Sequence, residues 1–234
     1  MQRHKLIKLL SPTVVIGKAT IMNCDCMTYM ATLPDKAFDL CICDPPYGIN
    51  VNHNMGRRAG NVPSNYKPVV WDTMPPEKAY FDELQRVAKH SIIWGANHFI
   101  DRIAKPSPCW IVWDKLFSED VSFASCELAY TDFDSVTKRF KLSSARVDGI
   151  HPTQKPVKLY EWLLTNYAKP GQRILDTHLG SGSSAIACNN LGFELVGCEL
   201  DKDYYEASIE RIKKANSVGK LFTPEQVYKS RKRG

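Results

Sequence analysis

Short apolar runs that alternate with amphipathic stretches constrain the fold of this chain more than any other feature. The apolar runs have the length and composition of buried strands and lie at 19–23, 38–43, 91–94, 109–113, 126–131, 173–175 and 194–198. The amphipathic stretches carry apolar residues on one helical face and lie at 77–89, 157–168 and 202–215. This alternation predicts an α/β fold, in which helices cover both sides of a mostly parallel, doubly wound sheet.

Length and composition fit one globular domain. The chain has 234 residues, of which 44% are hydrophobic and 24% are charged, so wholesale disorder and a fibrous fold are excluded. No apolar run is long enough to cross a bilayer, and the basic N-terminus lacks the long apolar segment of a secretory signal. We expect a single domain over residues 1–234 and a cytoplasmic location.

The eight cysteines lie mainly in or beside the strand-like runs. This placement is typical of small buried hydrophobes in a reducing compartment. The pairs Cys24/Cys26 and Cys41/Cys43 leave a metal site open as an alternative, but their C-x-C spacing is shorter than the usual spacing of zinc ligands. We therefore expect no metal.

The net charge of +6 is concentrated near the C-terminus. Residues 211–234 contain eight Lys or Arg and one acid. Such a run is typical of a solvated terminus, and it also occurs in segments that bind polyanions.

The tetrapeptide Asp44-Pro45-Pro46-Tyr47 directly follows the apolar run 38–43. Open α/β sheets place their chemistry at the carboxyl ends of strands. The two prolines lack N–H donors, so the motif offers a carboxylate, a carbonyl acceptor and an aromatic ring. This set suits a planar group that bears an NH2, such as the exocyclic amine of a nucleobase. The structural alternative is a Pro-Pro turn in which Asp44 only caps the strand.

Two stretches interrupt the strand and helix pattern, at about 48–70 and 132–150. The first is rich in Asn and Gly and contains Arg57 and Arg58, and the second contains Lys138 and Arg139. Long insertions in compact domains are often binding loops, and basic side chains in them are suited to phosphates. These four residues are candidate nucleic-acid contacts.

A glycine-rich turn lies between the strand at 173–175 and the following helix. Glycines such as Gly180 and Gly182 let a ligand approach the backbone, and Glu199 ends the next strand, where an acid commonly binds ribose hydroxyls. The glycine spacing also satisfies the loose dinucleotide fingerprint, so a nicotinamide oxidoreductase remains a competing interpretation. Asp176 argues against it, because a carboxylate before the glycines repels a pyrophosphate and attracts an amino or sulfonium group. The spacing and lysine of a P-loop are both missing.

A third motif, His151-Pro152-Thr153-Gln154-Lys155-Pro156, precedes the helix expected at 157–168. Prolines at both ends make a rigid corner that presents Thr153 and Lys155 in fixed directions, and Lys155 is suited to pair with a carboxylate.

Taken in order, the three motifs resemble the beta class of DNA amino-methyltransferases, over about residues 19–215. The resemblance is closest to short stand-alone enzymes of phages and restriction systems. It implies a seven-stranded doubly wound sheet, S-adenosylmethionine as cofactor, and double-stranded DNA as partner, with the insertions at 48–70 and 132–150 serving target recognition. A homodimer is compatible with it.

The resemblance also assigns roles to individual residues. It implies that Asp44, Pro45, Pro46 and Tyr47 hold a flipped base. It implies that the cofactor is bound by Asp25, Thr153, Lys155, Asp176, His178, Gly180, Ser181, Gly182 and Glu199. Asp201 matches a common acid of the family but also suits the cap of the helix at 202–215.

Family usage associates Asp at the first position of the catalytic motif with adenine, and Ser with cytosine. We therefore expect transfer of a methyl group to the exocyclic nitrogen of adenine, with the cytosine amine as the alternative. An inactive DNA-binding relative and a protein or RNA amino-methyltransferase are further alternatives. His178 departs from the family, which usually has Phe there, and predicts a dependence of activity on pH near neutrality.

Overall fold

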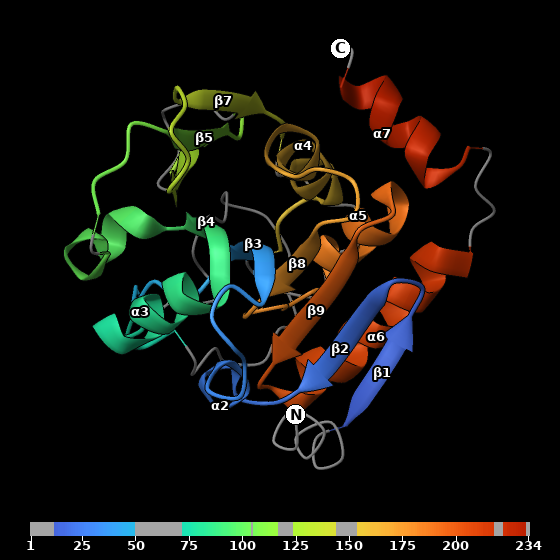
Figure 1. The fold of residues 1–234 in the computed structure, drawn as a ribbon, viewed down its shortest axis with the longest axis horizontal. Helices are drawn as coiled ribbons and strands as arrows, with labels where there is room; N and C mark the ends of the chain where they lie inside the picture. Colours follow the sequence, from blue (N-terminus) through green and yellow to red (C-terminus); the bar gives the residue numbers. More distant parts are fainter. Residues whose placement is uncertain are drawn as a thin grey trace, which may run out of the picture.

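The computed structural model describes residues 12–49, 72–103, 105–116, 124–143, 154–217 and 222–232. At its centre is a nine-stranded sheet with the order β1-β2-β9-β8-β3-β4-β6-β5-β7 (Figure 1). β1 pairs antiparallel with β2, and β6 pairs antiparallel with both of its neighbours; the other pairs are parallel. The predicted α/β fold with a mostly parallel sheet is therefore confirmed. The strands are β1 (Thr13–Ile16), β2 (Ala19–Asn23), β3 (Phe38–Cys43), β4 (Ala88–Trp94), β5 (Trp110–Asp114), β6 (Cys126–Thr131), β7 (Lys138–Lys141), β8 (Arg173–Asp176) and β9 (Glu194–Glu199).

The two edge strands distinguish this sheet from the seven-stranded sheet that the resemblance implies. β1 forms a hairpin with β2, and β7 lies beside β5. β7 falls inside the segment 132–150, which we expected to be a target-recognition insertion and in which we predicted no strand. Its sequence, KRFK, carries three charges in four residues, so no apolar run marks it as a strand.

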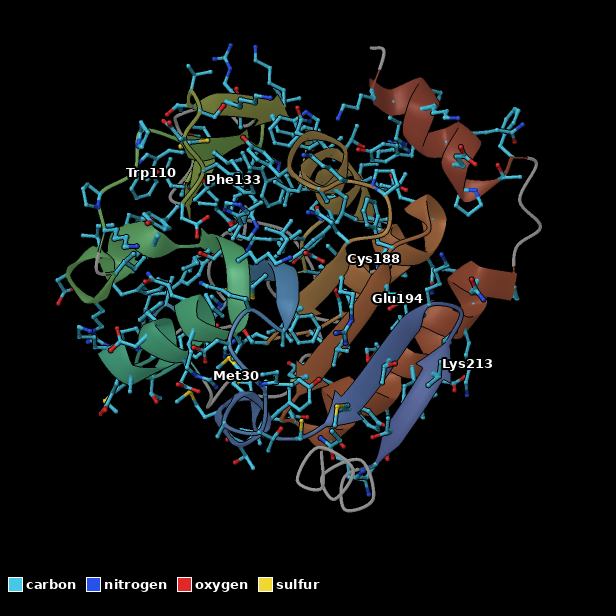
Figure 2. All side chains as sticks on the ribbon, viewed as in Figure 1. Met30, Trp110, Phe133, Cys188, Glu194 and Lys213 are labelled. Carbon is cyan, nitrogen blue, oxygen red and sulfur yellow. The ribbon has the colours of Figure 1, made fainter. Side chains whose placement is uncertain are left out.

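Helices cover both faces of the sheet. On one face lie α2 (Cys26–Met30) and α3 (Lys78–Val87); on the other lie α4 (Val157–Tyr167), α5 (Ser183–Leu191), α6 (Lys202–Ser217) and α7 (Pro224–Lys232). α3 ends at Val87, two residues before the predicted end, because β4 begins at Ala88. Figure 2 labels Met30 on α2 and Cys188 on α5, which belong to the cores on opposite faces of the sheet. No helix among the described residues is long and apolar enough to cross a membrane.

Alternation along β3 explains why this strand separates two cores. Leu40 and Ile42 belong to the core under α4 and α5, whereas Cys41 and Cys43 belong to the core under α2 and α3. All four side chains are at most 1% exposed. Successive residues of a strand point to opposite faces, so a continuous apolar run is what a strand buried on both faces requires.

β3 and β8 are the neighbours at which the winding of the sheet reverses. From β3 the chain continues to β4 on one side, and from β8 it continues to β9 on the other. A crevice forms at such a point, outside the carboxyl ends of the strands. The fold thus brings the end of β3, which leads into Asp44, next to the end of β8, which leads into the glycine-rich turn.

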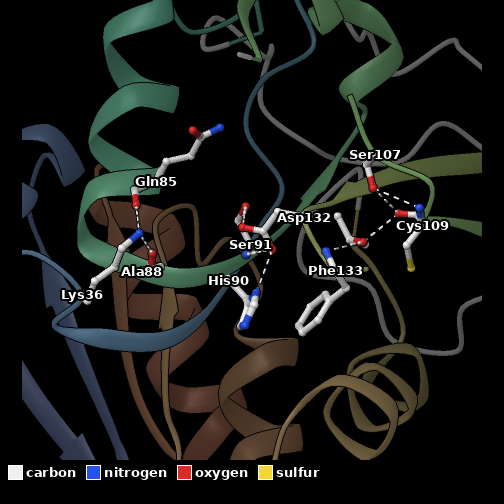
Figure 3. Close-up of polar contacts among 10 residues, drawn as sticks. Lys36, Gln85, Ala88, His90, Ser91, Ser107, Cys109, Asp132 and Phe133 are labelled. Carbon is white, nitrogen blue, oxygen red and sulfur yellow. Dashed lines mark hydrogen bonds and ion pairs between the residues drawn. The ribbon is translucent and has the colours of Figure 1, made fainter. Parts of the chain in front are cut away.

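Polar contacts fix the opposite edge of the sheet (Figure 3). The carboxylate of Asp132 accepts hydrogen bonds from the backbone N–H and the hydroxyl of Ser91, at 3.1 and 3.4 Å. The Lys36 ammonium donates to the carbonyls of Gln85 and Ala88, at 2.6 and 2.9 Å. These contacts tie β4 to the end of β6, and the segment before β3 to the junction of α3 and β4.

Candidate active site

A cavity of about 440 Å³ opens at the carboxyl ends of β3, β8 and β9. This volume lies within the usual range of small-molecule sites. Its charged lining residues are Asp25, Asp44, Glu199, Asp201 and Lys155. The other lining residues are Cys24, Cys26, Pro46, Gln154, Tyr160, Thr177, His178, Leu179, Gly180, Ser181, Leu200 and Tyr204. The cavity therefore runs from the glycine-rich turn to the Asp-Pro-Pro-Tyr motif.

Asp44 lies at one end of the cavity, in a network of charges. One carboxylate oxygen is 2.6 Å from the Lys155 ammonium, and the other accepts a hydrogen bond of 2.6 Å from the Tyr47 hydroxyl. Burial raises the pKa of Asp44, the nearby Glu127 raises it further, and Lys155 opposes both effects. The motif is therefore more than a turn: it presents a carboxylate to a cavity, next to a lysine from the third motif.

Tyr47 is held beside Asp44 and is not among the lining residues. Its backbone N–H donates to Asp72 at 2.7 Å, and its ring stacks on the imidazole of His98 with centroids 5.1 Å apart. The backbone of Gly95, at φ +68, lies directly against the ring. Stacking of Tyr47 on a base therefore requires the ring to move from this position.

The contact between Gly95 and Tyr47 can be tested with a pair of glycines. A Cβ at residue 95 would lie 2.1 Å from the Tyr47 ring, so Gly95→Ala is expected to displace the ring in addition to straining the backbone. Gly171→Ala is the matched control, because Gly171 has φ +87 and nothing within 4 Å of its Cβ position. Left-handed backbone costs a residue other than glycine about 1–2 kcal/mol, and we expect Gly95→Ala to lose clearly more free energy of unfolding than that. Equal losses in chemical denaturation would show that Tyr47 does not pack on residue 95.

Asp176 lies beneath the glycine-rich turn and not on the cavity wall. Its side chain is buried and accepts hydrogen bonds from the His178 backbone N–H at 3.0 Å and from the Ser184 hydroxyl at 2.5 Å. Burial raises its pKa to about 7, and these two hydrogen bonds oppose the shift. Asp176 thus holds the glycine-rich turn by hydrogen bonds, and any effect on a ligand in the cavity comes from its charge and not from direct contact. Gly182 is also absent from the lining, and at φ +74 it starts α5, with Ile212 filling the space of a Cβ.

The His178 side chain faces the cavity beside Tyr80, a residue of α3. Its Nδ1 lies 3.0 Å from the Thr177 hydroxyl and 3.4 Å from the Tyr80 hydroxyl. Burial lowers the pKa of His178 to about 4, so the imidazole is neutral throughout the neutral range. The expectation that His178 titrates near neutrality is therefore wrong, because the desolvated ring cannot hold a proton there.

The acids at the other end of the cavity are held by backbone contacts. The two carboxylate oxygens of Glu199 accept from the N–H groups of Gly180 and Asp201, at 2.8 and 2.9 Å, and keep further lone pairs for a ligand. Asp25 caps α2 by accepting from the Thr28 N–H at 2.7 Å. Asp201 accepts from the N–H groups of Asp203 and Tyr204, as expected of a helix cap.

The structure does not bring every candidate residue to this site. Arg57, Arg58, Thr153 and almost all of the insertion at 48–70 lie outside the described residues. Lys138 begins β7, at the edge opposite Asp44, and its ammonium contacts Asn166 at 2.9 Å; the neighbouring Arg139 is exposed.

The basic C-terminal segment also lies away from the cavity. Its helix α7 packs on α4 and α5, and the buried Tyr228 donates a hydrogen bond from its hydroxyl to the carbonyl of Ala168 at 2.8 Å, before the start of β8. α7 is therefore placed near the amino end of β8 and not at the Asp44 edge.

Glu127 is the main site residue that the sequence analysis missed. It lies in β6, and its carboxylate is 3.0 Å from the Lys155 ammonium. Tyr160 and Tyr204, which line the cavity from α4 and α6, were also missed. An acid within a strand-like run is a weak signal for Glu127, since only the fold brings it to Lys155.

Comparisons with known proteins identify the family of this chain. Residues 64–210 match the family model for N6/N4 methyltransferases, described as DNA methylase. YubD of Escherichia coli (strain K12), a protein that is named as a methylase, is 26% identical over 211 residues, which cover 80% of this chain and 87% of YubD. The type II methyltransferase M2.DpnII of Streptococcus pneumoniae is 35% identical over 70 residues, or 30% of this chain and 26% of that protein.

Two solved structures show the same fold. The M1.HpyAVI complex with SAM has a TM-score of 0.57 at 19% identity and covers 82% of this chain and 99% of that one. The PvuII DNA methyltransferase, described as cytosine-N4-specific, has a TM-score of 0.59 at 11% identity and covers 94% of each chain. Because the family model matches more than half of the residues, the resemblance is confirmed, and the chain belongs to the N6/N4 DNA methylase family.

Proposed function

We propose that this protein transfers a methyl group from S-adenosylmethionine to the exocyclic amino nitrogen of adenine in double-stranded DNA. The observation that carries the proposal is the single cavity that runs from Glu199 to Asp44. One end offers acceptors suited to a ribose, and the other end offers the carboxylate of the Asp-Pro-Pro-Tyr motif. A donor and an acceptor of a methyl group can meet only in a site of this kind.

The charge of the cavity fits this cofactor. Among the charged lining residues in the described part of the chain, four are acids, and the one lysine, Lys155, is paired with Asp44. An acidic wall favours a ligand with sulfonium and ammonium groups and disfavours a pyrophosphate. Glu199 would hold the ribose hydroxyls, and Gly180 and Ser181 would lie along the methionine portion. The same wall argues against a nicotinamide dinucleotide.

The cofactor supplies an electrophilic methyl group next to a neutral leaving sulfide. Asp44 would accept one hydrogen of the target amine, and the carbonyl of Pro45 would accept the other. These bonds orient the nitrogen lone pair toward the methyl carbon and stabilise the positive charge that develops on nitrogen. One proton must leave the nitrogen after the N–C bond forms, and Asp44, whose pKa is raised by burial, would receive it.

Tyr47 would give up its position at Asp44 to the base. Its hydroxyl now occupies one oxygen of the carboxylate, at 2.6 Å. The incoming amine would replace this hydroxyl, and the displaced ring would stack on the base, a contact worth about 1–3 kcal/mol in single-strand binders. Asp at position 44 favours adenine over cytosine, following the usage of the family that the chain resembles.

Transfer of label from S-adenosylmethionine with a tritiated methyl group to unmethylated DNA tests the proposed activity. We expect radioactivity in the DNA when protein, cofactor and DNA are all present. Calorimetry of the protein with S-adenosylmethionine and with NAD separates the competing classes. Binding of NAD alone would indicate an oxidoreductase, and binding of DNA without label transfer would indicate an inactive relative.

A further inference from the structure

Four side chains of alternating charge lie in a row at the catalytic end of the cavity. The Lys155 ammonium is 2.6 Å from Asp44 and 3.0 Å from Glu127, and the Lys115 ammonium is 2.6 Å from the second oxygen of Glu127. They come from the end of β3, the segment before α4, β6 and the residue after β5. Only Asp44 and Lys155 belong to the motifs of the sequence.

Burial makes this row a single electrostatic unit. The side chain of Lys155 is 3% exposed, and those of Lys115, Asp44 and Glu127 are 13%, 17% and 21% exposed. Lys155 also lies over the Trp94 ring, with its nitrogen 5.3 Å from the centroid. A buried ammonium that loses one of its two carboxylate partners stays stable only if the second carboxylate still compensates its charge.

The proposed reaction is favoured if the Lys155 ammonium moves from Asp44 toward a second partner. In the structure, Asp44 already accepts from Lys155 and Tyr47, so its charge is largely neutralised. A carboxylate that remains bound to an ammonium is a weaker acceptor for an amine. Glu127 provides the alternative partner, because it is already in contact with the same ammonium.

We propose that Glu127 is a positioning residue for methyl transfer, which takes over the Lys155 ammonium when the target amine engages Asp44. The proposal rests on the proposed function and extends it to a residue outside the motifs. Lys115 contacts the other oxygen of Glu127 and competes with Lys155 for this carboxylate, so it weakens the attraction of Lys155 to Glu127. Removing Glu127 should tie Lys155 to Asp44, whereas removing Lys115 should draw Lys155 toward Glu127.

The pKa values of Asp44 and Glu127 are shifted in opposite directions, which agrees with one acid holding Lys155 and the other contacting the amine. Burial opposes the ionisation of Glu127, but Lys155 and Lys115 together lower its pKa to about 2. Burial raises the pKa of Asp44. When two environments shift the pKa values of two acids apart, the acids take different roles. Glu127 therefore stays an anion, and Asp44 is the acid that exchanges the proton.

The pH dependence of kcat distinguishes positioning from simple structural support. Asp44 is faced by Lys155, Glu127 and Tyr47, and Asp176 lies at the end of the adjacent β8. In Glu127→Gln, the loss of a negative charge lowers the pKa of Asp44, so the acid limb should move to lower pH by about one unit, with kcat reduced about tenfold or more. In Lys115→Gln, the acid limb should move to higher pH. Glu127→Asp, which restores the charge, should recover part of kcat.

The experiment measures kcat against pH at saturating S-adenosylmethionine and DNA for these variants and for Glu83→Gln. Glu83 is the matched control, since it forms an ion pair of 2.8 Å with Arg86 on α3, away from the cavity. A wild type without any methyl transfer would refute the proposed function itself. With an active wild type, opposite shifts in Glu127→Gln and Lys115→Gln support the positioning role. Unshifted profiles, or a reduced kcat that Glu83→Gln reproduces, would overturn it.

Discussion

Replacing Asp44 by Asn is expected to lower kcat for methyl transfer by about a hundred- to a thousandfold, as is typical when one preorganised electrostatic contact is lost. The amide presents a donor where the target amine needs an acceptor, and it cannot receive the departing proton. The fold should persist, because Lys155 keeps its ion pair with Glu127 at 3.0 Å. Affinity for S-adenosylmethionine should also persist, since the ribose end of the cavity is unchanged. Steady-state rates with radiolabelled cofactor give kcat, single-turnover rates give the rate constant of the chemical step, and calorimetry gives the affinity.

A control for this variant lies at the start of β3, the strand that Asp44 directly follows. Asp39 in β3 also forms an ion pair with a lysine, Lys89, at 2.7 Å, but at the opposite edge of the sheet. Asp39→Asn is expected to keep the wild-type kcat. Near-normal kcat in Asp44→Asn, or an equal loss in both variants, would contradict the assignment of Asp44 as the group that contacts the amine.

Replacing Asp176 by Asn is expected to stabilise the cofactor-free protein at pH 8 and to weaken cofactor binding. The folded-state pKa of Asp176 is raised to about 7, above its ordinary value of 3.8, by burial. A raised pKa favours the folded state at low pH, and this contribution is lost as the pH rises through 7. Asn carries no charge, so we expect a gain of about 2–4 kcal/mol in the free energy of unfolding at pH 8 that shrinks toward pH 5.

The same linkage predicts how cofactor affinity varies with pH. A cationic ligand in the cavity favours the ionised form of Asp176, so its affinity should fall as the pH drops from 8 to 6. The Asn variant should bind more weakly and lose this dependence. Denaturation and calorimetry at the two pH values measure both effects. The account would be contradicted if the affinity of the wild type for the cofactor were constant from pH 6 to 8. It would also be contradicted if Asp176→Asn had a lower free energy of unfolding than the wild type at both pH values.

Local sequence patterns predicted the parts of the fold that carry their own periodicity. The strand β3 is an apolar run interrupted only by Asp39 near its start, and α4 has the helical spacing of apolar residues, so both were found. β7 was missed because it is charged and forms a strand only by pairing with β5. The helix α7 was missed because it is mostly polar and buries a single residue, Tyr228.

The same distinction applies to the site. Asp44, Glu199 and Lys155 were predicted because each belongs to a motif with a chemical role at a defined place in the chain. Glu127 has no such context, and its role follows from a contact between β6 and the segment before α4. Asp176 was predicted at the cavity wall but lies beneath it. Its carboxylate points toward the glycine-rich loop, where it accepts hydrogen bonds from His178 and Ser184.

The central claim is that Asp44 directs the amine of adenine toward the methyl group of the cofactor. Mass spectrometry of nucleosides from unmethylated DNA, incubated with the protein and S-adenosylmethionine that carries a deuterated methyl group, tests it most directly. The account predicts N6-methyladenine with the deuterium label from the wild type, and a strongly reduced yield from Asp44→Asn. Labelled N4-methylcytosine in place of methyladenine, or labelled methyladenine in equal yield from both proteins, would contradict it.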